Sequence, residues 1–180
     1  MKSLSFIFLV LFFQQAWSAK EVSLKPFDVN KKTFDSSTKK DQMVLKGVEK
    51  LGPGEKVAYA KIIQFYRKEN LADTLKAKED FLRIYPKSIY ADNALYLTGI
   101  LLMKNGNMGP AIQAFDQIIK EYPNGNKRAS AMFAKSIAYK NLNLNSQAIK
   151  YLQKVMKNYP GSLESQRAWV ELRLLKASKG

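Results

Sequence analysis

Residues 85–123 read YPKSIYADNALYLTGILLMKNGNMGPAIQAFDQIIKEYP, a stretch that begins and ends with Tyr-Pro. The dipeptide returns at Tyr159-Pro160, so the interval between successive copies is 37 residues both times. A fixed period of this length, with two helical patterns in each unit, is typical of helical-repeat arrays. One unit cannot bury its apolar face alone, so neighbouring units must stack. The period therefore predicts an all-α helical-repeat solenoid, an architecture that usually provides binding surfaces.

Each unit of this period is expected to form two helices. Apolar residues in the second half recur at i, i+3 and i+4 spacing from Ala111 to Tyr122, which indicates a helix with one buried face. The polar turn Asn105-Gly106-Asn107 separates the two helices, and Pro123 ends the second because proline disfavours helix in the residue before it. Within a repeat domain at 55–180, the pattern predicts three tetratricopeptide-like helix pairs and a C-terminal capping helix: 55–70 with 72–85, 90–104 with 109–122, 127–141 with 146–159, and 162–178.

Residues 1–18 have the pattern of a secretory signal peptide. Lys2 precedes an apolar run from Leu4 to Phe13, and the small residues Ala16 and Ser18 suit cleavage after Ser18. An uncleaved anchor is the alternative, but the run is shorter than the roughly 20 residues that span a membrane. The chain has no cysteine, so no lipid-modified cysteine can follow the cleavage site. We therefore expect a soluble periplasmic protein without a lipid anchor.

Two segments separate the signal peptide from the array. Residues 19–40 are basic and polar and show no helical period, so we expect a flexible linker that is either a spacer or a binding arm. Residues 41–54 predict a short helix followed by the break Gly52-Pro53-Gly54. The apolar residues of this helix align with those of the second helices after a shift of 37 residues. This alignment favours a remnant half-repeat that covers the first end of the stack.

The formal charge is +15, from 30 basic and 15 acidic residues, and it is unevenly distributed. Residues 127–180 hold eleven lysines and arginines but only two acidic residues. Such a field favours anionic partners. Lys150, Lys154 and Lys157 are expected to form a stripe on the outer face of the third pair, which is either a binding surface or simply solvated. Nucleic acid also fits this charge, but the export signal argues against it as a partner.

No catalytic arrangement emerges from the sequence. The chain has no histidine, which is the commonest general base and metal ligand. It also has no cysteine, which is a common nucleophile. The adjacent carboxylates Glu79 and Asp80 point to different sides of a helix, which does not suit joint acid–base catalysis. There is no glycine-rich phosphate loop and no metal-ligand spacing. The sequence thus predicts a non-enzymatic protein without cofactor or metal, and an enzyme built on a helical scaffold is the alternative.

The repeat unit resembles the tetratricopeptide repeat. Its Gly…Ala…Phe…Pro spacing is matched by Gly99, Ala111, Phe115 and Pro123. Residues 85–99, YPKSIYADNALYLTG, further resemble the C-terminal repeats of the periplasmic Tol-Pal system coordinator of cell division, which carry Tyr-Pro-x-Ser-x-x-Ala-Asp-x-Ala-x-Tyr-x-x-Gly. The style of repeat is also similar to that of an outer-membrane assembly lipoprotein with tetratricopeptide repeats.

This resemblance spans residues 55–178 and implies a scaffold in cell division or outer-membrane maintenance. The chain departs from both relatives. Coordinator proteins usually carry an N-terminal coiled coil that makes them trimers, but residues 20–50 hold no sustained heptad pattern, so the oligomeric state stays open. The assembly lipoprotein needs a cysteine that this chain lacks. The first pair also departs from the repeat, with Thr74 and Lys78 at its Ala and Phe positions.

The first helices of the pairs are expected to line the concave face of the stack and to bind the partner. Tyr59, Tyr96 and Phe133 follow one another at 37-residue steps and form an aromatic column. Such a column suits the anchoring of an extended or helical segment of an envelope protein. The alternative is that these aromatics fill the core between helices. The predicted partner-binding residues are Tyr59, Tyr66, Arg67, Asn93, Tyr96, Met103, Lys104, Phe133, Lys140, Asn141 and Arg167.

Basic residues are expected to contribute to this binding in one of two ways. In the first, Arg67, Lys104 and Lys140 meet acidic groups of the protein segment held by the aromatic column. In the second, the chain is an electrostatic module that sits on anionic glycan, lipid or lipopolysaccharide through residues 127–179. Binding that is lost steeply with added salt and is indifferent to the aromatic column favours the second hypothesis.

Overall fold

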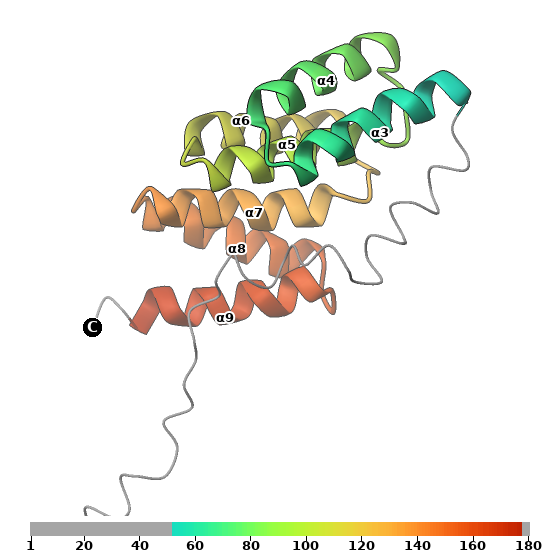
Figure 1. Ribbon diagram of the computed structural model, residues 1–180. Helices are drawn as coiled ribbons and strands as arrows, with labels where there is room; N and C mark the ends of the chain where they lie inside the picture. Colours follow the sequence, from blue (N-terminus) through green and yellow to red (C-terminus); the bar gives the residue numbers. More distant parts are fainter. Residues whose placement is uncertain (1–51, 178–180) are drawn as a thin grey trace, which may run out of the picture. The chain divides into compact units, whose positions relative to one another are not determined.

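The structure is a computed structural model in which residues 52–177 are described. Within this range the chain forms seven α-helices and no β-strand (Figure 1). The predicted signal peptide, the linker and most of the short helix and break at 41–54 lie outside the described residues. The helices are α3 (Pro53–Arg67), α4 (Leu71–Ile84), α5 (Ala91–Lys104), α6 (Met108–Glu121), α7 (Arg128–Asn141), α8 (Asn145–Asn158) and α9 (Leu163–Ala177).

The three predicted pairs and the last helix are confirmed: α3 pairs with α4, α5 with α6, α7 with α8, and α9 follows. One boundary differs from the expectation. Helix α3 begins at Pro53, inside the segment that was predicted to be a break, and Gly52 is its N-cap. Proline is well tolerated at this first position because the first turn of a helix does not use its N–H groups.

The helices stack in chain order, and the first helices of the pairs lie against one another (Figure 1). Helix α3 contacts α5, α5 contacts α7, and α7 contacts α9, whereas the second helices α4, α6 and α8 have at most weak contacts with each other. This difference places the first helices on the inner side of the curve. We call the surface of α3, α5, α7 and α9 the first-helix face, and that of α4, α6 and α8 the second-helix face.

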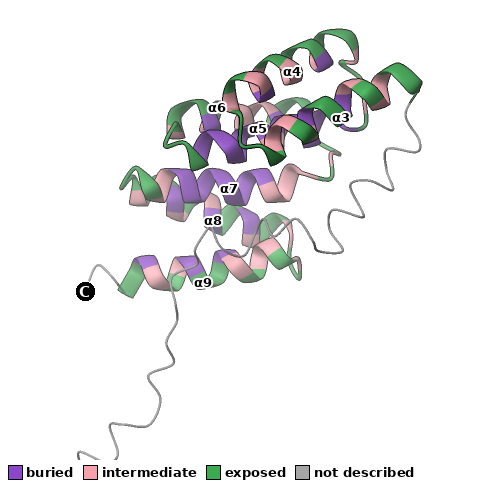
Figure 2. Ribbon diagram, in the orientation of Figure 1, coloured by how far each residue is buried: buried purple, intermediate pink, exposed green. Residues whose placement is uncertain are grey.

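Burial is concentrated in the middle of the array, as the purple residues of α5 and α7 show in Figure 2. The contact between Gly99 of α5 and Phe115 of α6 explains the repeat pattern there. A Cβ atom on Gly99 would lie 2.5 Å from Cε1 of Phe115, so the fully buried ring occupies the space of the missing side chain. In the third pair the equivalent residues are Ser136 and Leu152, both buried. A slightly larger residue on the first helix thus accompanies a smaller one on the second.

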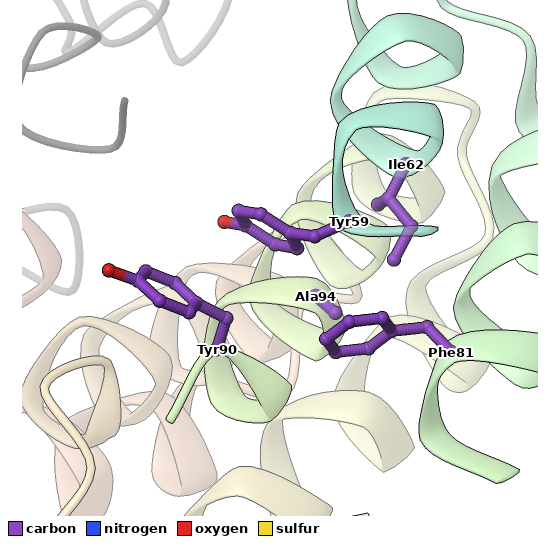
Figure 3. Close-up of a cluster of buried hydrophobic side chains, with 5 residues drawn as sticks. All are labelled: Tyr59, Ile62, Phe81, Tyr90 and Ala94. Carbon is purple, nitrogen blue, oxygen red and sulfur yellow. The ribbon is translucent and has the colours of Figure 1, made fainter. Parts of the chain in front are cut away.

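The degenerate first pair has an aromatic core of its own. Tyr59 and Ile62 of α3 and Phe81 of α4 are fully buried and pack with Tyr90 and Ala94 (Figure 3). The ring centroid of Tyr59 lies 5.7 Å from that of Phe81 and 5.0 Å from that of Tyr90. These rings hold α3 and α4 to the start of α5. The first pair therefore docks on the second even though it lacks the usual Ala and Phe.

Helix α9 ends the described array as a cap. Trp169 occupies the position of Leu95 and Met132 in the earlier first helices, which are buried, yet its side chain is 49% exposed because no described helix follows to cover it. The guanidinium carbon of Arg173 lies 4.8 Å from the Trp169 ring centroid and shields part of this surface. Arg173 stands where Gly99 stands in α5, so a long cationic side chain replaces the glycine there and covers part of the indole.

Candidate functional site

The predicted aromatic column is only partly on the surface of the first-helix face. Tyr59 has no exposed surface and Phe133 is buried, whereas Tyr96 is half-buried. The alternative interpretation, core filling, is therefore the correct one for Tyr59 and Phe133. The physical reason is the packing of first helices against one another, which encloses side chains that a single repeat would leave exposed.

Two further predicted residues of this face are also enclosed. Met103 and Asn93 are buried, and the Asn93 amide donates to the Asp92 carboxylate at 3.3 Å. With Tyr59 and Phe133, they are four predicted partner-binding residues that offer almost no surface to a partner. In the conformation described, these four stabilise the array and position their exposed neighbours.

The two predicted binding lysines are already paired within the chain. Lys104 forms an ion pair with Glu69, which lies in the turn between α3 and α4. The Nζ atom of Lys140 donates to Oε2 of Glu171 on α9 at 2.7 Å, and the Glu171 side chain is buried. Both ion pairs link neighbouring repeats. In the conformation described, carboxylates of this chain thus pair with both lysines, and a contact of these lysines with acidic groups of a partner stays a prediction.

The remaining predicted residues keep accessible surface on the first-helix face. Arg67 and Asn141 are exposed at the C-terminal ends of α3 and α7, and Tyr66, Tyr96 and Arg167 are half-buried. Helix α9 adds apolar surface to the same face, because Val170 is 39% exposed. This face thus presents aromatic, cationic, amide and aliphatic groups. Arg67 and Asn141 share one repeat position and form an exposed row across the stack.

Residues from three helices meet around Tyr96, and we call them the Tyr96 cluster: Tyr96, Lys127, Ser130, Glu164 and Arg167. The Nζ atom of Lys127 lies 5.7 Å from the centroid of the Tyr96 ring. The hydroxyl of Ser130 donates to the Glu164 carboxylate at 2.7 Å, which ties α7 to α9. Burial raises the pKa of Tyr96 to about 12; the nearby carboxylate of Glu164 raises it further and the Arg167 charge opposes it. Tyr96 is therefore a neutral hydrogen-bond donor at pH 7, close to the charges of Lys127 and Arg167.

The raised pKa of Tyr96 predicts a loss of stability in alkali. The Tyr96 hydroxyl loses its proton near pH 10 in the unfolded chain and near pH 12 in the folded chain. Its contribution to the free energy of unfolding is therefore present below pH 10 and is lost as the pH rises toward 12. We expect Tyr96→Phe to remove a slope of up to about 1.4 kcal/mol per pH unit in this window. Urea unfolding of both proteins at pH 8, 10 and 11 measures it, and equal slopes would contradict the burial of the hydroxyl.

The structure reveals a buried ionic group that sequence reasoning missed. Lys135 of α7 has a side chain that is 3% exposed, and its Nζ atom donates to Asp116 of α6 at 2.5 Å and to the hydroxyl of Tyr151 of α8 at 2.7 Å. Its ammonium also lies 4.2 Å from the Tyr151 ring centroid. The signal that could have revealed it is the 37-residue register, which places Lys135 at the position of the buried Thr98.

Asp92 was also missed as a structural residue. It is almost fully buried near the start of α5, and its carboxylate accepts a hydrogen bond from the backbone N–H of Lys127 at 3.0 Å, at the N-terminus of α7. A negative charge at a helix N-terminus is stabilising because the first N–H groups of the helix have no partners within it. Asp92 therefore joins consecutive repeats. Among residues 52–177, no three acidic residues come together as a possible metal site.

The predicted lysine stripe of the third pair lies on the surface, as expected. Lys150, Lys154 and Lys157 of α8 are all exposed on the second-helix face. In the part of the chain described here, no helix is both long enough and apolar enough to cross a bilayer.

Comparison with known proteins identifies the repeat. Residues 93–125 and 130–162 match the family model described as tetratricopeptide repeat, and these segments cover most of the second and third helix pairs. No curated protein shows significant similarity to the chain. The match identifies the repeat but no particular family of envelope proteins. The chain therefore contains tetratricopeptide repeats, which generally serve as non-enzymatic scaffolds for interactions between proteins.

Proposed function

We propose that this chain is a non-enzymatic periplasmic scaffold that binds a segment of an envelope protein on its first-helix face. The observation that carries the proposal is the Tyr96 cluster, which lies where the two matched tetratricopeptide repeats meet helix α9. The cluster offers a phenol donor, cationic side chains and a carboxylate on the inner side of the stack. Such groups suit an extended or helical peptide, whose carbonyls and acidic side chains accept hydrogen bonds.

The rest of the first-helix face supports this proposal. Arg67 and Asn141 are exposed on either side of the middle repeat, and Val170 offers apolar surface next to Arg167. The buried residues beneath them form a rigid base, because α5 and α7 are enclosed on most sides. A surface that is already ordered before binding lowers the ordering cost of the interaction.

The cellular setting of the proposal comes from the sequence. The signal-peptide pattern at 1–18 supports export, and the absence of cysteine supports a form without a lipid anchor. The resemblance of residues 85–99 to the Tol-Pal coordinator repeats supports a role in cell division or outer-membrane maintenance. An outer-membrane assembly accessory is the nearest alternative setting for the same binding face.

Site-specific crosslinking in cells tests the proposal. A photoreactive amino acid is introduced at Arg67 or Asn141 on the first-helix face, and at Gln113 or Gln153 as exposed controls on the second-helix face. We expect one envelope protein to be captured from positions 67 and 141 and not from 113 or 153. Capture only from the control positions, or equal capture from all four, contradicts the first-helix face as the binding site.

A charge-reversing variant measures the strength of the same interaction. The double substitution Arg67→Glu and Asn141→Glu puts two negative charges on the exposed row of the first-helix face. We expect the affinity for the captured segment to fall about tenfold, because like charges at the rim of an interface disfavour the encounter. The far-ultraviolet circular dichroism should not change. Unchanged affinity means that the partner does not cross this row.

A further inference from the structure

The third pair departs from the earlier pairs in the charge of its second helix. In α4, Arg83 is neutralised by Asp80 at 2.7 Å, three residues before it. The residue equivalent to Asp80 in α8 is Lys154. Helix α8 has no acidic residue, and neither has α7 beside it. The second-helix face therefore becomes purely cationic at the third pair.

The exposed lysines of the third pair all lie on α8. Lys135 and Lys140 of α7 are paired with Asp116 and Glu171, so they add no free charge to the surface. The exposed lysines of α8 make no ion pair within the described residues: Lys150, Lys154 and Lys157. Their i, i+4, i+7 spacing aligns them over roughly 10 Å of one helix face.

The third pair also departs from the earlier pairs in its turn. Leu142 is 43% exposed and Leu144 is 40% exposed, on either side of Asn143, and Leu144 is the N-cap of α8. The equivalent residues of the second pair are Asn105 and Asn107, and those of the first pair are Lys68 and Asn70. A leucine at an N-cap provides no side-chain acceptor for the helix, so its presence there is not explained by helix formation.

We propose that the third helix pair docks on the surface of an anionic lipid bilayer through Leu142, Leu144 and the three lysines of α8. Lipid phosphates neutralise the lysine stripe, and the two leucines enter the boundary between headgroups and acyl chains. A soluble anionic polymer would engage the lysines but leave the leucines in water. The combination of exposed leucines with an acid-free cationic helix therefore favours a lipid surface over a glycan.

This inference goes beyond the binding of a protein segment, because it uses the other side of the stack. Helix α8 belongs to the second-helix face, and the Tyr96 cluster belongs to the first-helix face. One molecule can thus hold its protein partner while it rests on a membrane surface. The two proposals also fail independently, since neither surface contains residues of the other.

Vesicle binding tests the inference with variants in which residues of the third pair are replaced by the equivalent residues of the second pair. The mature chain from Ala19 onward is sedimented with vesicles of phosphatidylglycerol and phosphatidylcholine in equal parts, or of phosphatidylcholine alone. The α8 double variant is Lys150→Gln with Lys154→Gln, because α6 has glutamine at both equivalent positions. The leucine double variant is Leu142→Asn with Leu144→Asn, because the turn before α6 has asparagine at both equivalent positions. Both variants use residues that the repeat already carries at these positions. The matched control is Lys61→Gln with Lys76→Gln, two exposed lysines elsewhere in the array.

We expect binding to the anionic vesicles but not to the neutral ones. The α8 double variant should weaken it about 30-fold, which corresponds to roughly fivefold for each lysine at an anionic surface. The leucine double variant should weaken it roughly tenfold. The control loses the same charge and should bind nearly as well as the unmodified chain.

Three results would overturn the inference. The first is an absence of binding to the anionic vesicles. The second is binding that the control variant weakens as much as the α8 variant, which shows a nonspecific effect of net charge. The third is binding that depends on the lysines but not on the leucines. If poly-glutamate then binds in the same lysine-dependent way, the occupant of α8 is an acidic protein segment instead.

Discussion

Replacing Phe115 by alanine is expected to lower the free energy of unfolding by about 3–5 kcal/mol, in the upper part of the range for large-to-small core substitutions. The ring is fully buried, and its centroid lies 6.0 Å from that of Tyr96. The wall opposite the ring is the backbone of Gly99, which has no side chain that could move into the cavity. The cavity therefore stays largely open.

Urea unfolding followed by circular dichroism measures this loss, and the third pair provides the control. Leu152 is equivalent to Phe115 and is also buried, but it is the smaller residue, and Ser136 takes the place of Gly99 in the third pair. We expect Leu152→Ala to cost about 1 kcal/mol less than Phe115→Ala. Fluorescence of Trp169, the only tryptophan within residues 19–180, reports on the end of the array. A loss below about 1.5 kcal/mol for Phe115→Ala contradicts the packing described here.

Most of the fold could be predicted from the sequence because the repeat encodes it more than once. The Tyr-Pro period, the apolar spacing and the turn residues all indicate the same helix boundaries, and the observed helices follow them closely. The exception is Pro53, which begins α3 where a break was expected. Proline is common at the first position of a helix and also interrupts helices, so Pro53 alone does not predict whether a helix begins or ends there.

The candidate site could be predicted less well, because exposure on the inner side depends on how closely neighbouring repeats approach. That approach encloses Tyr59 and Phe133 but leaves Tyr96 half-buried, although all three occupy the same repeat position. The ion pairs that neutralise Lys104 and Lys140 join residues 35 and 31 positions apart, which the 37-residue register does not indicate. Periodicity therefore predicts which residues share a face but not which of them pair across repeats.

The structure shows which basic residues in and around the third helix pair are paired with acidic residues, which a count of charges in the sequence cannot show. Two of the acidic residues in or beside the basic third pair, Asp116 and Glu171, pair with lysines of α7, and Glu164 bonds to Ser130. These contacts neutralise Lys135 and Lys140, the two lysines within α7. On the second-helix face, the exposed lysines of α8 make no ion pair within the described residues, so their charge is accessible to an anionic surface.

The second large effect is expected at the buried ammonium of Lys135. Burial alone would lower the pKa of Lys135, but the hydrogen bonds to Asp116 and Tyr151 outweigh it and hold the pKa above its ordinary value. The lysine is therefore charged inside the array, and Asp116 is its only anionic partner among the described ion pairs. Removing one member of a buried pair costs far more than replacing both, because the other charge is left without compensation.

We expect an asymmetric result from the two single substitutions. Asp116→Asn leaves the ammonium of Lys135 buried without an anion and should cost about 3 kcal/mol. Lys135→Met removes the charge and keeps an apolar stem, and Asp116 can be hydrated because its side chain is 32% exposed, so the cost should be about 1 kcal/mol. Urea unfolding at pH 7 measures both values.

The double variant decides whether the two residues act as a pair. If the ammonium of Lys135 is what makes the loss of Asp116 costly, Asp116→Asn should cost little once Lys135 is methionine, and the double variant should resemble Lys135→Met alone. The coupling energy from the four proteins is then about 3 kcal/mol, which is the cost of Asp116→Asn that disappears once Lys135 is methionine. Additive costs would mean that Lys135 and Asp116 stabilise the array separately. In that case the ion pair that joins α6 to α7 contributes nothing beyond its parts.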